Sequence, residues 1–168
     1  MSEITIRPAE PDDLPALTDI YNHYVLNTPV TFDVAPQSLA QRRAWFAQFA
    51  GGRYRCLAAI RDGSAIGWAS SARFKEKPAY ETTVETSIYL APDEAGQGLG
   101  RRLYETLFAA LADEDIHKVF AGITIPNAAS VGLHERLGFR LVGTYPEVGR
   151  KFGRYWDTAL LMRDFGGT

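Results

Sequence analysis

The sequence predicts an α/β domain built on a mixed central sheet, with helices on both faces. Strand-like and helix-like segments alternate along the 168 residues, with no linker or low-complexity stretch between them. Strand-like segments also follow one another directly in two places, and such grouping favours a mixed sheet over a wholly parallel one. The predicted order is β-α-α-β-β-β-α-β-α-β-β, and the length suits one domain spanning 1–168.

The first half of the chain is expected to hold one strand, two helices and a hairpin. Ile4 and Ile6 alternate with polar residues, as in a half-buried strand. Asp12 or Asp13 is expected to cap a helix whose apolar residues recur at helical spacing: Leu14, Leu17, Tyr21, Tyr24 and Val25. Ser38 and Gln41 form a capping box for a second helix, which we expect Gly51-Gly52 to end. The Asp62-Gly63 turn joins strands predicted at 57–60 and 66–72.

The second half alternates strands with helices before it closes on two strands. A strand at 84–90 leads into a glycine-rich loop and a helix at 101–111. A strand at 119–125 precedes a helix at 128–137, which Gly138 closes. The last two strands are expected near 139–145 and 155–162.

Composition and charge argue against several classes of function. The net charge of −2 provides no general basic surface, so no nucleic-acid partner is expected. Met1 to Pro11 is polar, and no apolar run approaches the roughly 20 residues of a spanning helix. We therefore expect a cytoplasmic protein with no membrane partner. Histidine spacing and the single cysteine indicate no metal site, and Cys56 lies among apolar residues as a buried, inert thiol would.

The glycine-rich loop consists of Ala95, Gly96, Gln97, Gly98, Leu99 and Gly100. Glycines let a backbone approach a ligand closely, and the first N–H groups of a helix lack partners within it, so the loop suits a diphosphate. It is not a Walker loop, because Arg101-Arg102 follows Gly100, and it lacks the third glycine of the dinucleotide motif. The alternative is a tight strand-to-helix turn that binds nothing.

The motifs around this loop resemble a known superfamily. Asn127 follows the fifth predicted strand, and Leu137-Gly138-Phe139 end the next helix. With the glycine loop, this arrangement resembles the GNAT superfamily of acetyl-CoA-dependent N-acetyltransferases. Six segments spread over nearly the whole chain resemble, more narrowly, the phosphinothricin and methionine sulfoximine acetyltransferases: Tyr21–Tyr24, Thr31–Asp33, Ser87–Tyr89, Pro126–Ser130, Leu133–Glu135 and Val148–Arg154.

The resemblance implies acetyl-CoA as co-substrate, a small-molecule amine as acceptor, and direct transfer without a metal. Two residues depart from the family pattern. Ala95 stands where superfamily members usually carry Arg or Gln, and Tyr155 stands where the subfamily often has Trp. Because the diphosphate cradle consists mainly of backbone N–H groups, we expect Ala95 to weaken a side-chain contact without abolishing cofactor binding.

Two residues are candidates for catalysis. Glu85 shares a strand face with Ser87 and Tyr89, on the strand that leads to the loop, where a carboxylate could accept a proton from the acceptor ammonium. The resemblance implies this general-base role, and a solvated carboxylate is the alternative. The resemblance also implies a catalytic role for His134, where relatives carry a tyrosine that protonates the departing thiolate. A histidine hydrogen-bonded at a helix–sheet interface is the alternative reading.

Cofactor contacts are expected mainly from the backbone. If the strand before the loop splays from its neighbour, the amides of Ile88, Tyr89 and Leu90 can bond the pantetheine arm and the acetyl oxygen, while 95–100 hold the diphosphate. The resemblance adds a side-chain hydrogen bond from Asn127. A helix cap is an equally natural role for that residue.

The acceptor is expected at a basic and aromatic loop upstream of Glu85. The resemblance implies that Lys75, Lys77 and Tyr80 hold the oxygens of an anionic amino acid, such as phosphinothricin, methionine sulfoximine or methionine sulfone, and Phe32 could form a wall. Lys77 replaces an arginine of some relatives, which removes a bidentate donor. The alternatives are a polyamine or a protein N-terminus as acceptor, or a non-catalytic acyl-CoA sensor.

The resemblance also implies a homodimer. Aromatic side chains are candidates for its interface: Trp68, Tyr155 and Trp156.

Overall fold

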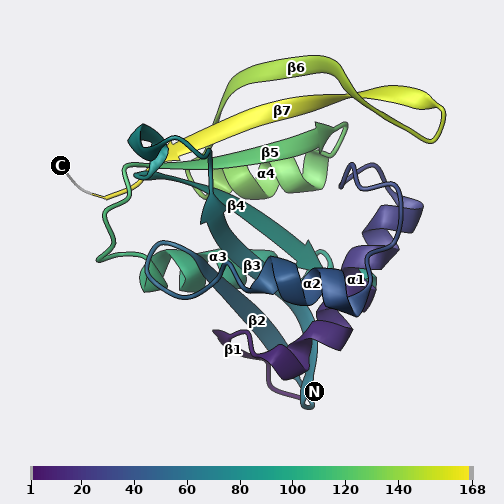
Figure 1. Cartoon of the computed structure of the whole chain (residues 1–168), viewed down its shortest axis with the longest axis vertical. Helices are drawn as coiled ribbons and strands as arrows, with labels where there is room; N and C mark the ends of the chain where they lie inside the picture. Colours follow the sequence, from purple (N-terminus) through teal and green to yellow (C-terminus); the bar gives the residue numbers. More distant parts are fainter. Residues whose placement is uncertain (1, 167–168) are drawn as a thin grey trace.

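A seven-stranded mixed sheet forms the centre of the computed structural model, which describes residues 2–166. The strands lie in the order β1-β2-β3-β4-β5-β7-β6 (Figure 1). Their bounds are β1 Thr5–Pro8, β2 Arg55–Arg61, β3 Ser64–Arg73, β4 Thr83–Leu90, β5 Lys118–Ile125, β6 Arg140–Lys151 and β7 Arg154–Asp164. The β4–β5 pair is parallel, and the other pairs are antiparallel. The mixed sheet and the element order predicted from the sequence are confirmed.

Helices cover both faces of the sheet, as predicted. α1 (Leu14–Asn27) and α2 (Leu39–Phe46) pack on one face, while α3 (Leu99–Ala110) and α4 (Ala128–Arg136) pack on the other. Successive strand residues serve opposite cores: Leu57 packs on the α3 side and Cys56 on the α1 side. Cys56 is buried as expected, and burial raises the pKa of its thiol to about 12.

Trp68 belongs to the core between β3, α1 and α2, so its predicted place in a dimer interface is wrong. Its side chain is 1% exposed, stacks on Tyr89 at 4.9 Å between ring centroids, and meets Trp45 edge-on. On β3 its neighbour Ala69 faces the other core. The alternation of strand residues therefore directs the indole inward, against helices of the same chain.

The helix ends agree with the predicted caps in two cases, the Ser38–Gln41 box and Gly138, which follows α4 at φ 88°, and they differ in two others. In the capping box, Gln41 N–H donates to Ser38 Oγ and Ser38 N–H donates to Gln41 Oε1. Asp13 instead closes a short 3₁₀ turn, η1 (Pro11–Asp13), where it accepts from Glu10 N–H and Arg7. α2 ends at Phe46 rather than near Gly51. The next N–H groups bond three residues back, Gln48 to Trp45 and Phe49 to Phe46, so the chain continues as turns and not as α-helix.

The last two strands are longer than predicted and form one hairpin. The chain turns at Phe152 and Gly153, with φ of 54° and 70°, as in a two-residue hairpin turn. Register shifts at Leu141/Gly143 and Tyr145/Gly149 let β6 bend along β7. The segment Val148–Arg154 therefore forms the tip of the hairpin.

The sheet opens between β4 and β5. The parallel pairing comprises three pairs and ends at Glu85–Phe120, although β4 continues to Leu90 and β5 to Ile125. In Figure 1, β5, β6 and β7 run across the direction of β2, β3 and β4. The splay foreseen from the sequence is thus present, and it creates a gap beside the end of β4.

Two further expectations concern what the chain can bind. In residues 2–166, no helix combines the length and apolar character needed to cross a bilayer. Within the same range, His, Cys, Asp and Glu side chains form no group of three that could hold a metal.

Candidate active site

The glycine-rich loop leads into the start of α3, whose first N–H groups have no partner within the helix. A short 3₁₀ turn, η3 (Pro92–Glu94), precedes it, and buried Glu94 pairs with Arg61 at 2.5 Å, which ties the loop to β2. Gly98 is left-handed at φ 80° and occupies the N-cap position of α3, where it has no side chain that could bond the N–H groups that follow. A Cβ at Gly96 or Gly98 would meet no atom within 4 Å, so the space over the loop is open. These features fit an anion such as a diphosphate.

The side chains of the loop take little part in this cradle. Ala95 is extended and exposed. Gln97 is turned back, with its Nε2 donating to Asp93 C=O at 3.2 Å. Leu99 is buried against the sheet, and Gly100 lies where a Cβ would come within 3.1 Å of Leu133. The predicted contacts from 95–100 are therefore available from the main chain.

The end of β4 presents main-chain groups to the gap. Ala91 N–H donates to Ile66 C=O of β3 at 2.8 Å. Main-chain groups of successive residues in an antiparallel strand point to opposite sides, so those of Tyr89 point to β3, whereas those of Ile88 and Leu90 point away from it. The β4–β5 ladder has ended there, so both face the gap. The Leu90 carbonyl accepts from Tyr24 hydroxyl at 2.6 Å. Ile88 and Leu90 thus offer donors, whereas Tyr89 contributes its ring.

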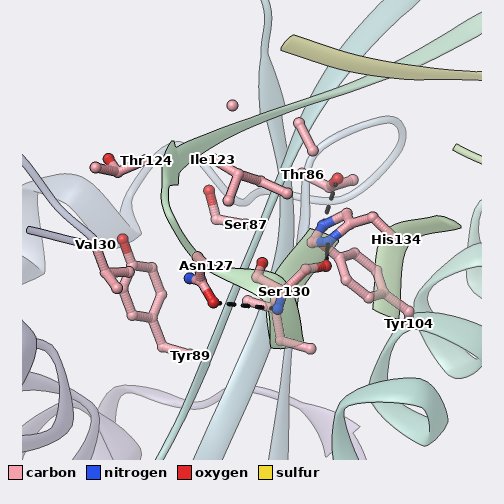
Figure 2. Close-up of a pocket in the computed structure, with 13 residues that line it drawn as sticks. Val30, Thr86, Ser87, Tyr89, Tyr104, Ile123, Thr124, Asn127, Ser130 and His134 are labelled. Carbon is pink, nitrogen blue, oxygen red and sulfur yellow. Dashed lines mark hydrogen bonds between the residues drawn. The ribbon is translucent and has the colours of Figure 1, made fainter. Parts of the chain in front are cut away.

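A cavity of about 60 Å³ lies in this gap, and a hydrogen-bonded pair lines it (Figure 2). His134 is 2% exposed, and its Nδ1 is 2.7 Å from Ser130 C=O, which only accepts, so Nδ1 carries the proton. Its Nε2 therefore accepts from Tyr104 hydroxyl at 2.8 Å. Burial lowers the pKa of His134 and favours this neutral form.

Sequence reasoning did not identify Tyr104. It lies on the buried face of α3 with Leu103 and Leu107, is 0% exposed, and its hydroxyl lies 3.5 Å from Thr86 Oγ1. A tyrosine on an otherwise apolar helix face needs a partner for its hydroxyl, and this pattern in the sequence could have identified Tyr104. His134 alone was predicted, and its position beside Tyr104 makes the two a unit.

Asn127 serves as the cap of α4 and also lines the same cavity. Its Oδ1 accepts from Ser130 N–H at 3.2 Å, which is the capping role considered from the sequence (Figure 2). The cap uses the oxygen, and the side-chain amide nitrogen is left to donate elsewhere.

Glu85 lies where the β4–β5 ladder ends. It pairs with Phe120 on β5 and with Ala72 on β3, and it shares its strand face with Ser87 and Tyr89. The side chain is half-buried, and desolvation by burial raises the pKa of its carboxyl. A raised pKa moves this carboxylate toward the range useful to a general base at neutral pH.

The predicted acceptor residues form two separate groups on the surface. Lys75, Lys77 and Tyr80 are exposed in the β3–β4 connection, which contains the 3₁₀ turn η2 (Pro78–Tyr80). Lys75 Nζ lies 5.2 Å from the Tyr80 ring centroid, and Phe74 joins this loop to Phe120 at 5.0 Å. Through Phe120 the loop adjoins Glu85.

Phe32 comes from the α1–α2 loop and lies against Gly149 of β6. An ideal Cβ on Gly149 would fall 2.3 Å from the Phe32 ring, so the glycine is what lets the two segments approach. The ring is 38% exposed. Phe32 is thus held by the tip of the β6–β7 hairpin rather than by the loop that carries Lys75.

Known proteins share both the sequence and the fold of this chain. The model of the acetyltransferase (GNAT) family matches residues 17–139. The chain is 52% identical to a phosphinothricin N-acetyltransferase of Streptomyces coelicolor, over 96% of each protein. It is 38% identical to an L-methionine sulfoximine/L-methionine sulfone acetyltransferase of Pseudomonas aeruginosa, over 98% of this chain and 96% of that protein.

Solved structures agree. A phosphinothricin acetyltransferase of Sinorhizobium meliloti, solved in complex with AcCoA, superposes with a TM-score of 0.92 at 35% identity, over 99% of this chain and 90% of that one. A putative acetyltransferase of Salmonella typhimurium, solved with acetyl-CoA, also reaches 0.92 at 34% identity, over 99% and 96%. The chain therefore belongs to the GNAT family and is an acetyl-CoA-dependent N-acetyltransferase.

Proposed function

We propose that this enzyme transfers acetyl from acetyl-CoA to the α-amino group of a small amino acid analogue, of the phosphinothricin, methionine sulfoximine or methionine sulfone type. The names of the relatives reported above support this choice of acceptor. The observation that carries the proposal is the end of the β4–β5 pairing at Glu85. Beyond it, Ile88 of β4 lines a cavity together with the Tyr104–His134 pair, and β4 then leads toward the glycine loop.

Acetyl-CoA supplies the activated acetyl group as a thioester. The residues available to hold it are those of the loop, with N–H groups from 95 to 101 for the diphosphate, and Ile88, Leu90 and Asn127 for the arm and the acetyl carbonyl. Fixed amide donors stabilise negative charge on a carbonyl oxygen without a proton or a metal. Their open placement supports this use of the loop.

Glu85 is proposed as the general base. The amine of an amino acid is protonated at neutral pH and must lose a proton before it can attack the thioester. Glu85, directly or through a water, takes that proton, and its raised pKa makes it a stronger base than an exposed carboxylate.

Tyr104 and His134 are proposed to act together on the leaving sulfur. In this pair the mobile proton is that of the Tyr104 hydroxyl, because His134 donates Nδ1–H to Ser130 and accepts at Nε2. Burial raises the pKa of Tyr104, so the hydroxyl stays protonated. Its single proton is donated to His134 Nε2 in this structure, and we propose that the hydroxyl turns from His134 to the sulfur as negative charge develops there.

A thiol-release assay over a panel of acceptors tests the proposed function. The panel contains phosphinothricin, methionine sulfoximine, methionine sulfone, spermidine and a short peptide. We expect release with the amino acid analogues. Turnover restricted to spermidine or the peptide would show a different acceptor, and acetyl-CoA binding with no turnover at all would indicate a sensor.

Replacing Glu85 with Gln should lower kcat by about 10²- to 10⁴-fold and leave acetyl-CoA affinity unchanged, since the glycine loop is untouched. The base is active only when unprotonated, so wild-type kcat/KM should fall as the pH drops through a pKa above the ordinary glutamate value, and the variant should lack this limb. Glu81→Gln, an exposed site four residues upstream, is the control. A wild-type rate and pH profile in E85Q would remove Glu85 as the base.

Removing the Tyr104 hydroxyl tests the proposed pair. Tyr104→Phe should lower kcat about tenfold to a hundredfold at a nearly unchanged KM for acetyl-CoA, because the group acts as charge develops on sulfur. Tyr54→Phe, outside the cavity, should behave as wild type. Stopped-flow thiol release gives the rate and thermal unfolding checks the fold. Loss of stability with an unchanged rate would assign Tyr104 to structure alone.

Adding a methyl group at Gly149 tests Phe32 as a wall of the acceptor site. Gly149→Ala should displace the Phe32 ring and raise the acceptor KM severalfold, with the acetyl-CoA KM unchanged. Gly143→Ala lies on the same strand, where a Cβ would meet the Leu160 side chain at an ordinary 3.7 Å, and should have no effect. Equal kinetics for the two variants would exclude a role for Phe32 in acceptor binding.

We further propose a cytoplasmic homodimer that pairs through the β6–β7 hairpin. Six of the ten large hydrophobic side chains most exposed in the described chain lie on it: Leu141, Val142, Tyr145, Val148, Phe152 and Tyr155. Contiguous exposed apolar surface typically marks an interaction site. Sedimentation equilibrium should give twice the 18.6 kDa of one chain, and Val142→Glu should shift it toward the monomer. A monomeric wild type would refute this assembly.

A further inference from the structure

A second cavity, of about 310 Å³, lies between α1, α2 and the β3–β4 face of the sheet. It adjoins the first cavity, since Ser87 and Tyr89 line both. Its walls are aromatic, with Trp45 and Trp68 among them. None of the groups assigned above to the transfer of acetyl explains this space.

A buried arginine lines this cavity with unused donors. Arg42 is 3% exposed, and its Nε and Nη2 have no hydrogen-bond partner in residues 2–166. It forms no ion pair in that range either, and its guanidinium lies 3.7 Å from the Trp45 ring centroid and 4.3 Å from that of Tyr21. Burying a cation without an anionic partner is costly, so the stacked rings hold it in place without neutralising it.

A second donor opens on the same cavity. The Trp68 indole Nε1–H is buried and has no acceptor in the described chain, and the Arg42 guanidinium lies 5.6 Å from the Trp68 ring centroid. A buried indole N–H normally finds an acceptor. Arg42 and Trp68 are therefore two unsatisfied donors, one of them charged, beside one empty volume.

The carboxylate on this cavity does not neutralise Arg42. Asp33 accepts from the Tyr21 hydroxyl and from Gln37 Nε2, and within residues 2–166 it forms no salt bridge with Arg42. Burial lowers the pKa of Arg42 in spite of Asp33, Tyr21 and Tyr89 nearby. The cation is thus undercompensated until a ligand supplies an oxyanion.

We propose that this cavity is an anion subsite, in which the Arg42 guanidinium and the Trp68 N–H bind an oxyanion of the acceptor. This rests on the proposed function, because the acceptor's amine must reach the β4–β5 gap while its acidic group passes Ser87 and Tyr89 into the cavity. A guanidinium matches the geometry of a carboxylate or a phosphinate. The subsite also disfavours polyamines, whose charge repels Arg42.

Replacing the guanidinium by an apolar chain of similar length tests the subsite. Arg42→Met keeps the stacking between Tyr21 and Trp45 and removes the charge. We expect the phosphinothricin KM, and its Kd by calorimetry with CoA present, to rise about tenfold or more, with the acetyl-CoA KM unchanged. Arg43→Met, the exposed neighbour on α2, is the matched control. A folded R42M with the wild-type KM and Kd would overturn the proposal.

Two milder variants keep the test valid if R42M does not fold. Arg42→Lys retains the charge and loses the fork, and Trp68→Phe retains a ring and loses the N–H. Each should weaken phosphinothricin binding severalfold, and unchanged binding in both folded variants would also overturn the proposal.

Simple anions and modified acceptors separate the subsite from the proposed function. Inorganic phosphate or acetate should change the tryptophan fluorescence of the wild type, through Trp45 and Trp68, and not that of R42M, whether or not acetyl is transferred. A wild type that binds anions through Arg42 but acetylates no amino acid analogue would support the anion subsite and refute the proposed acceptor. Phosphinothricin amide lacks the carboxylate and keeps the phosphinate. If its binding still depends on Arg42, the phosphinate is the oxyanion bound; if that dependence is lost, the carboxylate is.

Discussion

The end of the β4–β5 ladder at Glu85–Phe120 is the constraint on which the rest of the site depends. β4 stays paired with β3 as far as Leu90, opposite Gly67, and β5 stays paired with β7 through Ile125. The sheet thus has two halves, β1 to β4 and β5 to β7, and three residue pairs between β4 and β5 join them. Gly67 is required for the close pairing of β3 with the end of β4, because a Cβ there would lie 2.9 Å from the Tyr89 carbonyl oxygen. The backbone groups beyond the end of the β4–β5 ladder are left available to a ligand. In a continuous sheet they would be hydrogen-bonded to the neighbouring strand.

Two sets of buried polar groups on either side of β4 differ in how fully they are satisfied. Toward α3 and α4, His134 has a partner at each ring nitrogen. The fold therefore determines both its tautomer and the direction of its hydrogen bond with Tyr104. Toward α1 and α2, Arg42 and Trp68 have donors without acceptors among residues 2–166. A satisfied network orients a group for chemistry, whereas unsatisfied donors beside a cavity indicate a missing ligand atom.

The order of elements, the mixed sheet and the Ser38–Gln41 box could be predicted because local spacing and local hydrogen bonds determine them. The separation of β4 from β5 could be stated from the sequence only as a condition for cofactor binding, because it depends on which strands remain paired across the sheet. Trp68 was misjudged because an aromatic residue on a strand fits a core and an interface equally well until the helices are placed. Tyr104 and Arg42 were missed for the same reason: each is one position in a helix pattern, and only packing shows what its polar end meets.

The two halves of the reaction use different kinds of recognition, and this explains where the chain can vary. The glycine loop and the end of β4 offer main-chain donors, which every substitution except proline leaves in place, so Ala95 is compatible with the proposed diphosphate cradle. The acceptor residues proposed above come from four separate segments: the α1–α2 loop, α2, the β3–β4 connection and the hairpin tip. Each can change independently of cofactor binding. Under the proposed assignment, specificity among amines can diverge while the acetyl-CoA site stays constant. The buried Arg42 would then constrain the acceptor more strongly than exposed lysines, because solvent screens a buried charge less.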